Sequence, residues 1–280
     1  MKSILLKNIP KEMNTYVEPF LGGGTLFLTL QPRKAILSDI NPWLVLIFKC
    51  ILSCRKKFIT RVRQLDVRLH NAKCTRNVYE KLVKEFNTDT PSVKSIPHDI
   101  SHLINHTALF YVICKKSYGG NVKFDKNNHL SSSIALGQMT RDIINEVLID
   151  SIYNYMKTAD IKFMCGDYIT SLRHCKEGDF VYLDPPYFGH EDSKTINKYH
   201  GKEFLDDQHD ELKKVMDTLT KEGCKVMLSN SFSSYMEDLY QNDKKYKIKK
   251  FLIRRPLNNQ KRVSSRKKSG KFNELLIMNY

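Results

Sequence analysis

Short apolar runs alternate with stretches of helical periodicity along most of the 280-residue chain. Apolar runs of this length, several of them ending in an acid, predict buried strands of a sheet. The predicted strands cover residues 16–20, 34–39, 161–167, 180–183, 225–231, 246–253 and 274–280. Helical spacing of apolar residues predicts helices over residues 25–30, 206–222 and 235–240. This alternation of strands and helices is typical of a doubly wound α/β sheet.

The middle of the chain follows a different pattern. Between Asn41 and about Thr140 the periodicity is helical, and strand signals are few. We therefore expect an inserted, mainly helical domain over residues 49–141, and a discontinuous main domain made of residues 1–48 and 142–280. Within the insertion, residues 121–130 alternate polar and apolar positions around a turn rich in Asp and Asn, which predicts a hairpin. The last two strands of the chain lack room for a crossover helix, so we expect an antiparallel hairpin at one sheet edge.

The run Asp184-Pro185-Pro186-Tyr187 ends the predicted strand 180–183 abruptly. Two prolines remove two backbone donors and stop ladder pairing, so the Asp184 carboxylate and the proline carbonyls point off the strand end. Ligands bind at that end of the strands in open α/β sheets. Two acceptors beside the flat ring of Tyr187 suit an exocyclic amine on a nucleobase. A rigid turn after a buried strand is the structural alternative.

Three consecutive glycines and two acids lie at the ends of other predicted strands. The glycines, residues 22–24, allow backbone to approach a ligand closely, although a tight structural turn also needs them. Asp39, with Asn41 two residues later, ends a strand where an acid commonly accepts both hydroxyls of a ribose. Pro42 at a first helical position favours a helix cap there instead. Asp167 either caps a helix or accepts a hydrogen bond from an adenine amino group.

The charge balance favours a polyanionic partner. Lys and Arg total 46 against 30 acids, which gives a net charge of +16 and a pI near 9.4. Such an excess favours nucleic acid over a small neutral substrate. Thirteen Lys or Arg and no acid lie between Lys244 and Lys271, as expected for an arm that contacts phosphates or for a solvated loop. A second basic region, Lys49 to Arg76, has nine Lys or Arg and only Asp66 opposing them.

Cysteine spacing and hydropathy exclude several classes. The seven cysteines are scattered without any C-x-x-C pair, which argues against a zinc site or a disulfide framework and favours a reducing compartment. The chain has no apparent signal peptide and no apolar run near the length of a membrane span. We expect a soluble intracellular protein with neither a membrane nor a metal as partner.

Taken together, these motifs resemble the Dam-type (D12 class) family of DNA adenine-specific methyltransferases. The resemblance rests on the order and spacing of residues 16–24, 38–41, 165–168, 179–187, 228–231 and 273–280. The acid-Pro-Pro-Tyr motif alone is shared with other amino-methylating enzymes. Its combination with Glu-Pro-Phe-x-Gly-x-Gly upstream and with the Asn-Glu-Leu-Leu-Ile ending is specific.

The resemblance implies a Rossmann-like domain that binds S-adenosyl-L-methionine, with an inserted domain for target recognition. It also implies double-stranded DNA as the partner, a monomer acting on it, and methylation of an adenine flipped out of the stack. The implied cofactor-binding residues are Glu18, Pro19, Phe20, Gly22, Gly24, Asp39, Asn41, Asp167 and Tyr168. The implied catalytic residues are Asp184, Pro185, Pro186 and Tyr187.

The stretch Lys115 to Gly120 is similar to a basic, aromatic and glycine-containing stretch that precedes a DNA-reading hairpin in the family. The hairpin itself diverges here, so its base contacts cannot be transferred, and its polar residues serve equally well as turn residues. With the basic segment near the C-terminus included, the candidate DNA-binding residues are Lys115, Lys116, Tyr118, Lys123, Lys126, Asn127, Asn128, Arg266, Lys267 and Lys268.

Family members usually carry a Gly-Gly-Lys segment ahead of the first strand, whereas this sequence starts with Met1-Lys2-Ser3. We expect either weaker cofactor binding or a start that lies upstream. Two other functions stay open. One is methylation of the amino group of cytosine or of an RNA base, because the acid-Pro-Pro-Tyr motif does not fix the ring. The other is a catalytically inactive DNA-binding relative.

Overall fold

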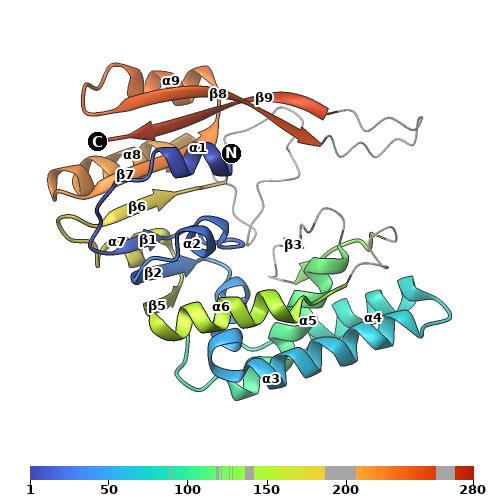
Figure 1. Cartoon of the computed structure of the whole chain (residues 1–280). Helices are drawn as coiled ribbons and strands as arrows, with labels where there is room; N and C mark the ends of the chain where they lie inside the picture. Colours follow the sequence, from blue (N-terminus) through green and yellow to red (C-terminus); the bar gives the residue numbers. More distant parts are fainter. Residues whose placement is uncertain are drawn as a thin grey trace.

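The computed structural model describes residues 1–88, 90–117, 120, 122–125, 127, 129–135, 142–186, 206–256 and 269–280. Within these residues a seven-stranded sheet has the order β5-β2-β1-β6-β7-β9-β8 (Figure 1). Its strands are β1 (Tyr16–Glu18), β2 (Lys34–Asp39), β5 (Asp160–Cys165), β6 (Phe180–Leu183), β7 (Lys225–Ser231), β8 (Lys247–Pro256) and β9 (Ser269–Met278). The five strands from β5 to β7 are parallel, and β9 is antiparallel to both β7 and β8. The predicted α/β class and the predicted edge hairpin are both confirmed.

Helices cover both faces of the sheet. Those on one face are α1 (Lys2–Lys7), α2 (Thr25–Leu30), α6 (Glu146–Thr158) and the start of α3 (Pro42–His70). Those on the other face are α7 (Tyr168–Leu172), α8 (Asp206–Lys221) and α9 (Ser234–Gln241). Alternate residues of each strand enter the two cores, as the two-residue period of a strand requires: Tyr16 faces the first core and Val17 the second. The sheet is therefore buried on both sides, and its parallel strands are continuous apolar runs.

The middle of the chain forms a helical group beyond the β5 edge of the sheet (Figure 1). Its elements are the rest of α3, α4 (Thr75–Asn87), the short 3₁₀ helix Ser101–Leu103, α5 (Ile104–Lys116), β3 (Lys123–Phe124) and β4 (Leu130–Ser131). Helix α3 leaves helical geometry at Cys54, where φ is −138° and ψ is 29°. Strands β3 and β4 pair antiparallel, with Phe124 opposite Leu130, which confirms the predicted hairpin.

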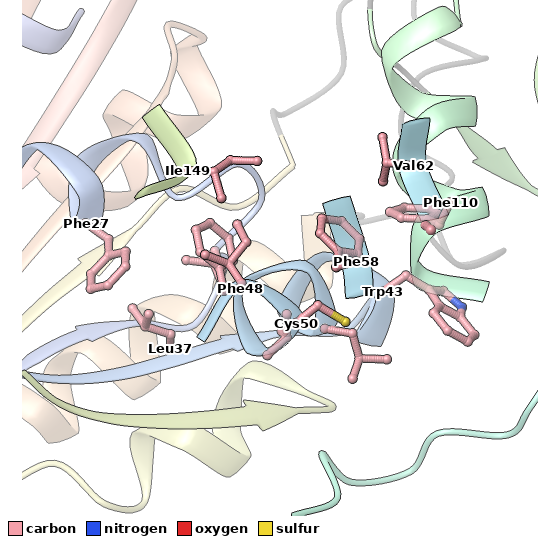
Figure 2. Packing of buried hydrophobic residues seen from close by; sticks show 14 of the residues in the cluster. Phe27, Leu37, Trp43, Phe48, Cys50, Phe58, Val62, Phe110 and Ile149 are labelled. Atoms are coloured by element: carbon pink, nitrogen blue, oxygen red, sulfur yellow. The ribbon is translucent and has the colours of Figure 1, made fainter. Parts of the chain in front are cut away.

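One continuous apolar core joins the helical group to the sheet. Figure 2 shows side chains of this core, from Phe27 and Leu37 at the sheet to Phe58 in α3 and Phe110 in α5. The rings of Phe27 and Phe48 meet edge to face with centroids 6.1 Å apart, so the start of α3 is packed directly on α2. The division of the chain into two domains stays a prediction.

Strands β1, β5 and β9 each end two residues before the apolar pattern predicts. Strand β1 stops at Glu18 because Pro19 has no backbone N–H to continue the ladder. Strand β5 stops at Cys165 because Gly166 turns the chain with φ of +125° before Asp167 begins α7. Both turns bring polar residues to the carboxyl edge of the sheet. Of the helices that the structure describes, none is long and apolar enough to cross a bilayer.

Candidate active site

Three acids converge at the carboxyl ends of adjacent parallel strands. Glu18 ends β1, Asp39 ends β2, and Asp184 follows β6. The order β2-β1-β6 places β1 between the other two strands, and the register pairs Glu18 with Leu37 of β2. The negative charges of Asp184 and Asp39 both act on the Glu18 carboxyl. The acids that the sequence places at separate strand ends thus form one cluster.

The glycine turn after β1 is tied to the end of β2. Asp39 accepts hydrogen bonds from the backbone N–H of Gly22 through Oδ2 and of Asn41 through Oδ1, both at 2.9 Å. A Cβ added to Gly24 would lie 2.7 Å from Phe48 Cζ, and φ of this residue is +61°, so the turn needs glycine here. A Cβ added to Gly22 or Gly23 would meet no atom within 4 Å. Among the described residues, the turn therefore has open space beside the acid cluster, which fits a ligand that lies against the backbone.

Burial changes the titration of two of the acids. Burial raises the pKa of Asp39 to about 6. The hydrogen bonds that Asp39 accepts from Asn41, Gly22 and Ile40 lower the pKa, but by less than burial raises it. Burial also raises the pKa of Glu18 to about 8, and the nearby Asp184 charge acts in the same direction. Glu18 is therefore mostly protonated at neutral pH.

A tyrosine of the same strand holds the Glu18 side chain. The Tyr16 hydroxyl donates to Glu18 Oε2 at 2.9 Å, and both side chains are buried. Burial raises the pKa of Tyr16 well above its usual value, with Glu18 as a further cause. The Tyr16 hydroxyl therefore stays protonated at neutral pH and remains a donor to Glu18.

Several predicted cofactor-binding residues have structural partners as well. Asn41 caps α3, its side chain accepting from the N–H of Trp43 at 3.1 Å, and Asp167 caps α7 by accepting from Ile169 N–H at 3.0 Å. The capping alternative is therefore realised for Asp167, whereas the residue that caps the helix starting at Pro42 is Asn41 and not Asp39. Asp167 is also exposed, so its second oxygen lies at the surface beside the end of β5.

The two aromatic candidates, Phe20 and Tyr168, stack on each other with ring centroids 5.3 Å apart and planes 28° apart. Tyr168 is buried, whereas Phe20 is half-buried. Phe20 thus covers Tyr168, and it has the larger surface available to a ligand. Pro19 is buried beneath the turn.

The acid after β6 is exposed but anchored. Asp184 Oδ1 accepts a hydrogen bond of 2.8 Å from the hydroxyl of Ser229 in β7, and that hydroxyl lies 2.9 Å from the Tyr182 hydroxyl. Pro185 is buried and Pro186 half-buried, as expected for a rigid strand end. Tyr187 lies outside the described residues.

The predicted DNA-binding residues have different surroundings. Lys115 is exposed, with its ammonium 5.5 Å from the Tyr111 ring centroid. Lys116 is only 1% exposed and forms an ion pair with Asp66 at 3.0 Å, which favours a structural role. Lys123 and Asn127 are exposed on the hairpin. The other predicted DNA contacts fall outside the described residues: Tyr118, Lys126, Asn128, Arg266, Lys267 and Lys268.

Arginines of the second basic region stabilise the helical group. Arg61 and Arg68 of α3 both pair with Glu85 of α4, at 3.5 and 3.0 Å. Arg55 pairs with Asp150 of α6 at 3.2 Å. Part of the positive charge of α3 is therefore neutralised by neighbouring helices, and the region is less basic than its sequence suggests.

The polar residues that support the acids are not among the site residues predicted from the sequence. Tyr16 and Tyr182 each lie two residues before an acid, Glu18 or Asp184, and residues two apart on a strand share a face. That spacing was the available signal. The contribution of Ser229 depends on the pairing of β6 with β7, which the sequence does not fix.

All seven cysteines are unpaired, and Cys50 and Cys224 are buried. Within the described part of the chain, no three His, Cys, Asp or Glu side chains are grouped so as to hold a metal ion.

The sequence is similar to known methyltransferases over nearly its whole length. The family model of the D12 class N6 adenine-specific DNA methyltransferases matches residues 2–252, which confirms the predicted family. The chain is 29% identical over 274 residues to the Type II methyltransferase M1.LlaDCHI of Lactococcus lactis subsp. cremoris, covering 97% of this chain and 88% of that protein. It is 30% identical over 291 residues to the Type II methyltransferase M.MjaIII of Methanocaldococcus jannaschii, covering 98% and 93%. It is 23% identical over 244 residues to the DNA adenine methylase of Escherichia coli strain K12, covering 87% and 81%. The chain therefore belongs to the D12 class of N6 adenine-specific DNA methyltransferases.

Proposed function

We propose that this DNA adenine methyltransferase uses S-adenosyl-L-methionine as methyl donor and acts on an adenine flipped out of double-stranded DNA. The observation that carries the proposal is the exposed Asp184 carboxylate, fixed at the end of β6 beside the open glycine turn that follows β1. In this proposal the nucleobase amine binds at Asp184 and the methyl donor binds at the glycine turn of the neighbouring strand. Base chemistry of this kind requires the base to leave the stack.

The glycine turn and its neighbours form the donor side of the site. Phe20, Gly22 and Gly24 would hold the methionine part of the donor, and the open space over Gly22 supports this assignment. Asp39 receives the ribose hydroxyls. An ionised carboxylate has about four lone-pair positions, so the backbone hydrogen bonds from Gly22, Asn41 and Ile40 still leave acceptor capacity on Asp39. Asp167 and Tyr168 lie on the adenine side, beyond β5.

The strand end of β6 forms the base side. S-adenosyl-L-methionine, when bound, supplies a methyl group on a positively charged sulfur. Asp184 and the Pro185 carbonyl accept the two N–H groups of the target amine and orient its lone pair, with Tyr187 as the stacking surface. Positioning of this kind lowers a barrier by roughly 7 to 11 kcal/mol. The acceptors would also stabilise the positive charge that develops on the amine, and one proton of the methylated amine would then pass to water.

The exposed residues Lys115, Lys123 and Asn127, together with the basic segment near the C-terminus, are proposed to contact the DNA. The protein is proposed to act as a monomer. Two of the relatives are Type II methyltransferases by name, which supports a place in a restriction–modification system.

The test combines a substitution with identification of the methylated base. Asp184→Ala should abolish methyl transfer with little loss of stability, because Asp184 is exposed at a strand end. Asp160→Ala is the matched control, since this acid lies at the opposite end of β5 with 77% of its side chain exposed. Near-normal turnover of Asp184→Ala would show that the pocket is misplaced.

The methylated DNA is then hydrolysed to nucleosides, and only methyladenine is expected. Methylcytosine as the sole product would favour cytosine as the target. An inactive DNA-binding relative would instead give no heat of binding with S-adenosyl-L-methionine in calorimetry.

A further inference from the structure

A short hydrogen-bonded row connects the interior of the sheet to the exposed acid. The Tyr182 hydroxyl lies 2.9 Å from Ser229 Oγ, and Ser229 Oγ lies 2.8 Å from Asp184 Oδ1. Tyr182 is 3% exposed and Ser229 is fully buried, whereas Asp184 is exposed. The row thus begins in the core and ends at the edge of the site.

The register of two parallel strands builds this row. Leu183 of β6 pairs with Leu228 of β7, so the next residues, Asp184 and Ser229, are neighbours. Tyr182 lies two residues before Asp184 and therefore shares its face of the sheet. Both strands are buried central strands of the sheet, which makes the positions of the two hydroxyl groups rigid.

The direction of the hydrogen bonds follows from which of the three groups carries a proton that it can donate. An ionised carboxylate only accepts, so the single hydroxyl proton of Ser229 is donated to Asp184. The contact between Tyr182 and Ser229 then requires the Tyr182 hydroxyl to be the donor. The order is Tyr182 O–H to Ser229 O, and Ser229 O–H to Asp184 Oδ1.

We propose that Ser229 and Tyr182 are positioning residues for methyl transfer, which act by fixing the rotation of the Asp184 carboxylate. This inference rests on the proposed function of Asp184. An exposed carboxylate attached to a strand end rotates freely about its side-chain bonds unless a neighbour holds it. Ser229 holds one oxygen from the core side, and Tyr182 holds the Ser229 hydroxyl in the rotamer that donates. The acceptor geometry for the target amine is then set before DNA binds.

The test measures the rate of methyl transfer at saturating donor and DNA for Ser229→Ala and Tyr182→Phe. Ser229→Ala removes a hydrogen bond to a charged group, so kcat should fall by about tenfold to a hundredfold. Tyr182→Phe removes a neutral hydrogen bond, and kcat should fall by about three- to tenfold. The KM values for donor and DNA should stay near those of the wild type, because neither residue is proposed to contact either molecule.

The double variant separates positioning from a general structural effect. If Tyr182 acts only through Ser229, then adding Tyr182→Phe to Ser229→Ala causes no further loss of kcat. If the two substitutions damaged the structure independently, their fold losses of kcat would instead multiply. Tyr240→Phe is the matched control, because its buried hydroxyl donates to Met216 Sδ at 3.4 Å in the core on the other face of the sheet. Its kcat should equal that of the wild type.

The outcomes distinguish this inference from the proposed function. If Asp184→Ala is inactive while Ser229→Ala and Tyr182→Phe keep wild-type kcat, the positioning role is wrong. The proposed role of Asp184 in the active site is then still supported. If Asp184→Ala is active, the proposed function itself fails. If Ser229→Ala does not fold, Tyr182→Phe still decides, since it deletes a single oxygen atom and keeps the ring in place.

Discussion

The Asp39 carboxylate at the end of β2 accepts a 2.9 Å hydrogen bond from the backbone N–H of Gly22 in the turn after β1. The same carboxylate accepts from the N–H of Asn41, which caps α3. One buried acid therefore fixes the glycine turn and the start of the longest helix described. Its role in binding a ribose would depend on this structural role, because the carboxylate is oriented by the two backbone groups.

Asp39→Ala should weaken donor binding by at least about tenfold, because the turn loses the acceptor that orders it. The free energy of unfolding should also fall by about 1 to 3 kcal/mol, since the buried N–H of Asn41 and the half-buried N–H of Gly22 lose their partner. Calorimetric titration with S-adenosyl-L-methionine and urea unfolding measure the two effects. Asp39→Asn, which keeps one acceptor oxygen, should lie between Asp39→Ala and the wild type. A wild-type dissociation constant for Asp39→Ala would remove this residue from the donor site.

An added methyl group should destabilise the protein at one of two neighbouring glycines and have little effect at the other. Gly24→Ala places a Cβ 2.7 Å from Phe48 Cζ at a φ of +61°, so it should destabilise the protein by roughly 1 to 3 kcal/mol. Gly23→Ala meets no atom within 4 Å and has no left-handed φ, so its stability should change by less than about 0.5 kcal/mol. Thermal unfolding of both variants checks the difference. Equal midpoints would mean that the packing of Phe48 against the turn is not maintained in solution.

The boundaries of an element could be predicted from the sequence where an apolar run ends in residues that cannot continue a strand. Strands Lys34–Asp39 and Phe180–Leu183 have the predicted boundaries, because an acid or Asp-Pro-Pro follows the buried run. The helix Thr25–Leu30 also matches, since glycines precede it. In these segments the local chemistry alone determines where the element begins or ends.

Strand order and contacts between strands that are far apart in the chain could not be predicted from the sequence, because they depend on pairing between distant segments. The position of β9 between β7 and β8 is set by backbone pairing and packing over long separations, and no local signal encodes it. The contact of Ser229 with Asp184 depends on the same kind of register. For Asp167 both a cap and a ligand were compatible with its position, and only the structure adds the hydrogen bond to Ile169.

The buried Glu18 carboxyl should make stability depend on pH in the neutral range. Its pKa is about 8 in the folded protein and its ordinary value is 4.5, so between these values the folded state binds more protons than the unfolded state. The free energy of unfolding therefore falls as the pH rises through this window. Asp39 acts in the same direction but only up to a pKa of about 6. Between pH 6.5 and 8.5 the loss due to Glu18 should be about 2 kcal/mol.

Glu18→Gln should remove most of this dependence, because a neutral amide keeps the shape and still accepts from the Tyr16 hydroxyl. Urea unfolding of wild type and variant at pH 6.5 and 8.5 gives the comparison. The variant should be the more stable protein at pH 8.5. Parallel slopes for the two proteins would show that Glu18 is not the titrating group.

The basic segment near the C-terminus should bind DNA mainly through phosphates. Replacing Arg266, Lys267 and Lys268 with Gln should weaken binding similarly for every DNA sequence, since phosphates carry no sequence information. The slope of the logarithm of the binding constant against the logarithm of the salt concentration should become shallower by roughly 2 to 3 if all three contact phosphates. Fluorescence anisotropy at several salt concentrations measures the slope.

The control for this experiment is a pair of lysines whose charges are already neutralised within the protein. Lys213 and Lys245 each lie within 3.2 Å of carboxylate oxygens of both Asp217 and Asp243. Replacing both lysines with Gln also removes positive charge but takes these ion pairs away from Asp217 and Asp243, so Tm should fall while the salt slope stays at the wild-type value. If the control changes the slope as much as the triple variant, DNA binding responds to net charge and not to a localised basic segment. If neither variant changes it, the phosphate contacts lie elsewhere, and the exposed Lys115 and Lys123 become the first residues to replace.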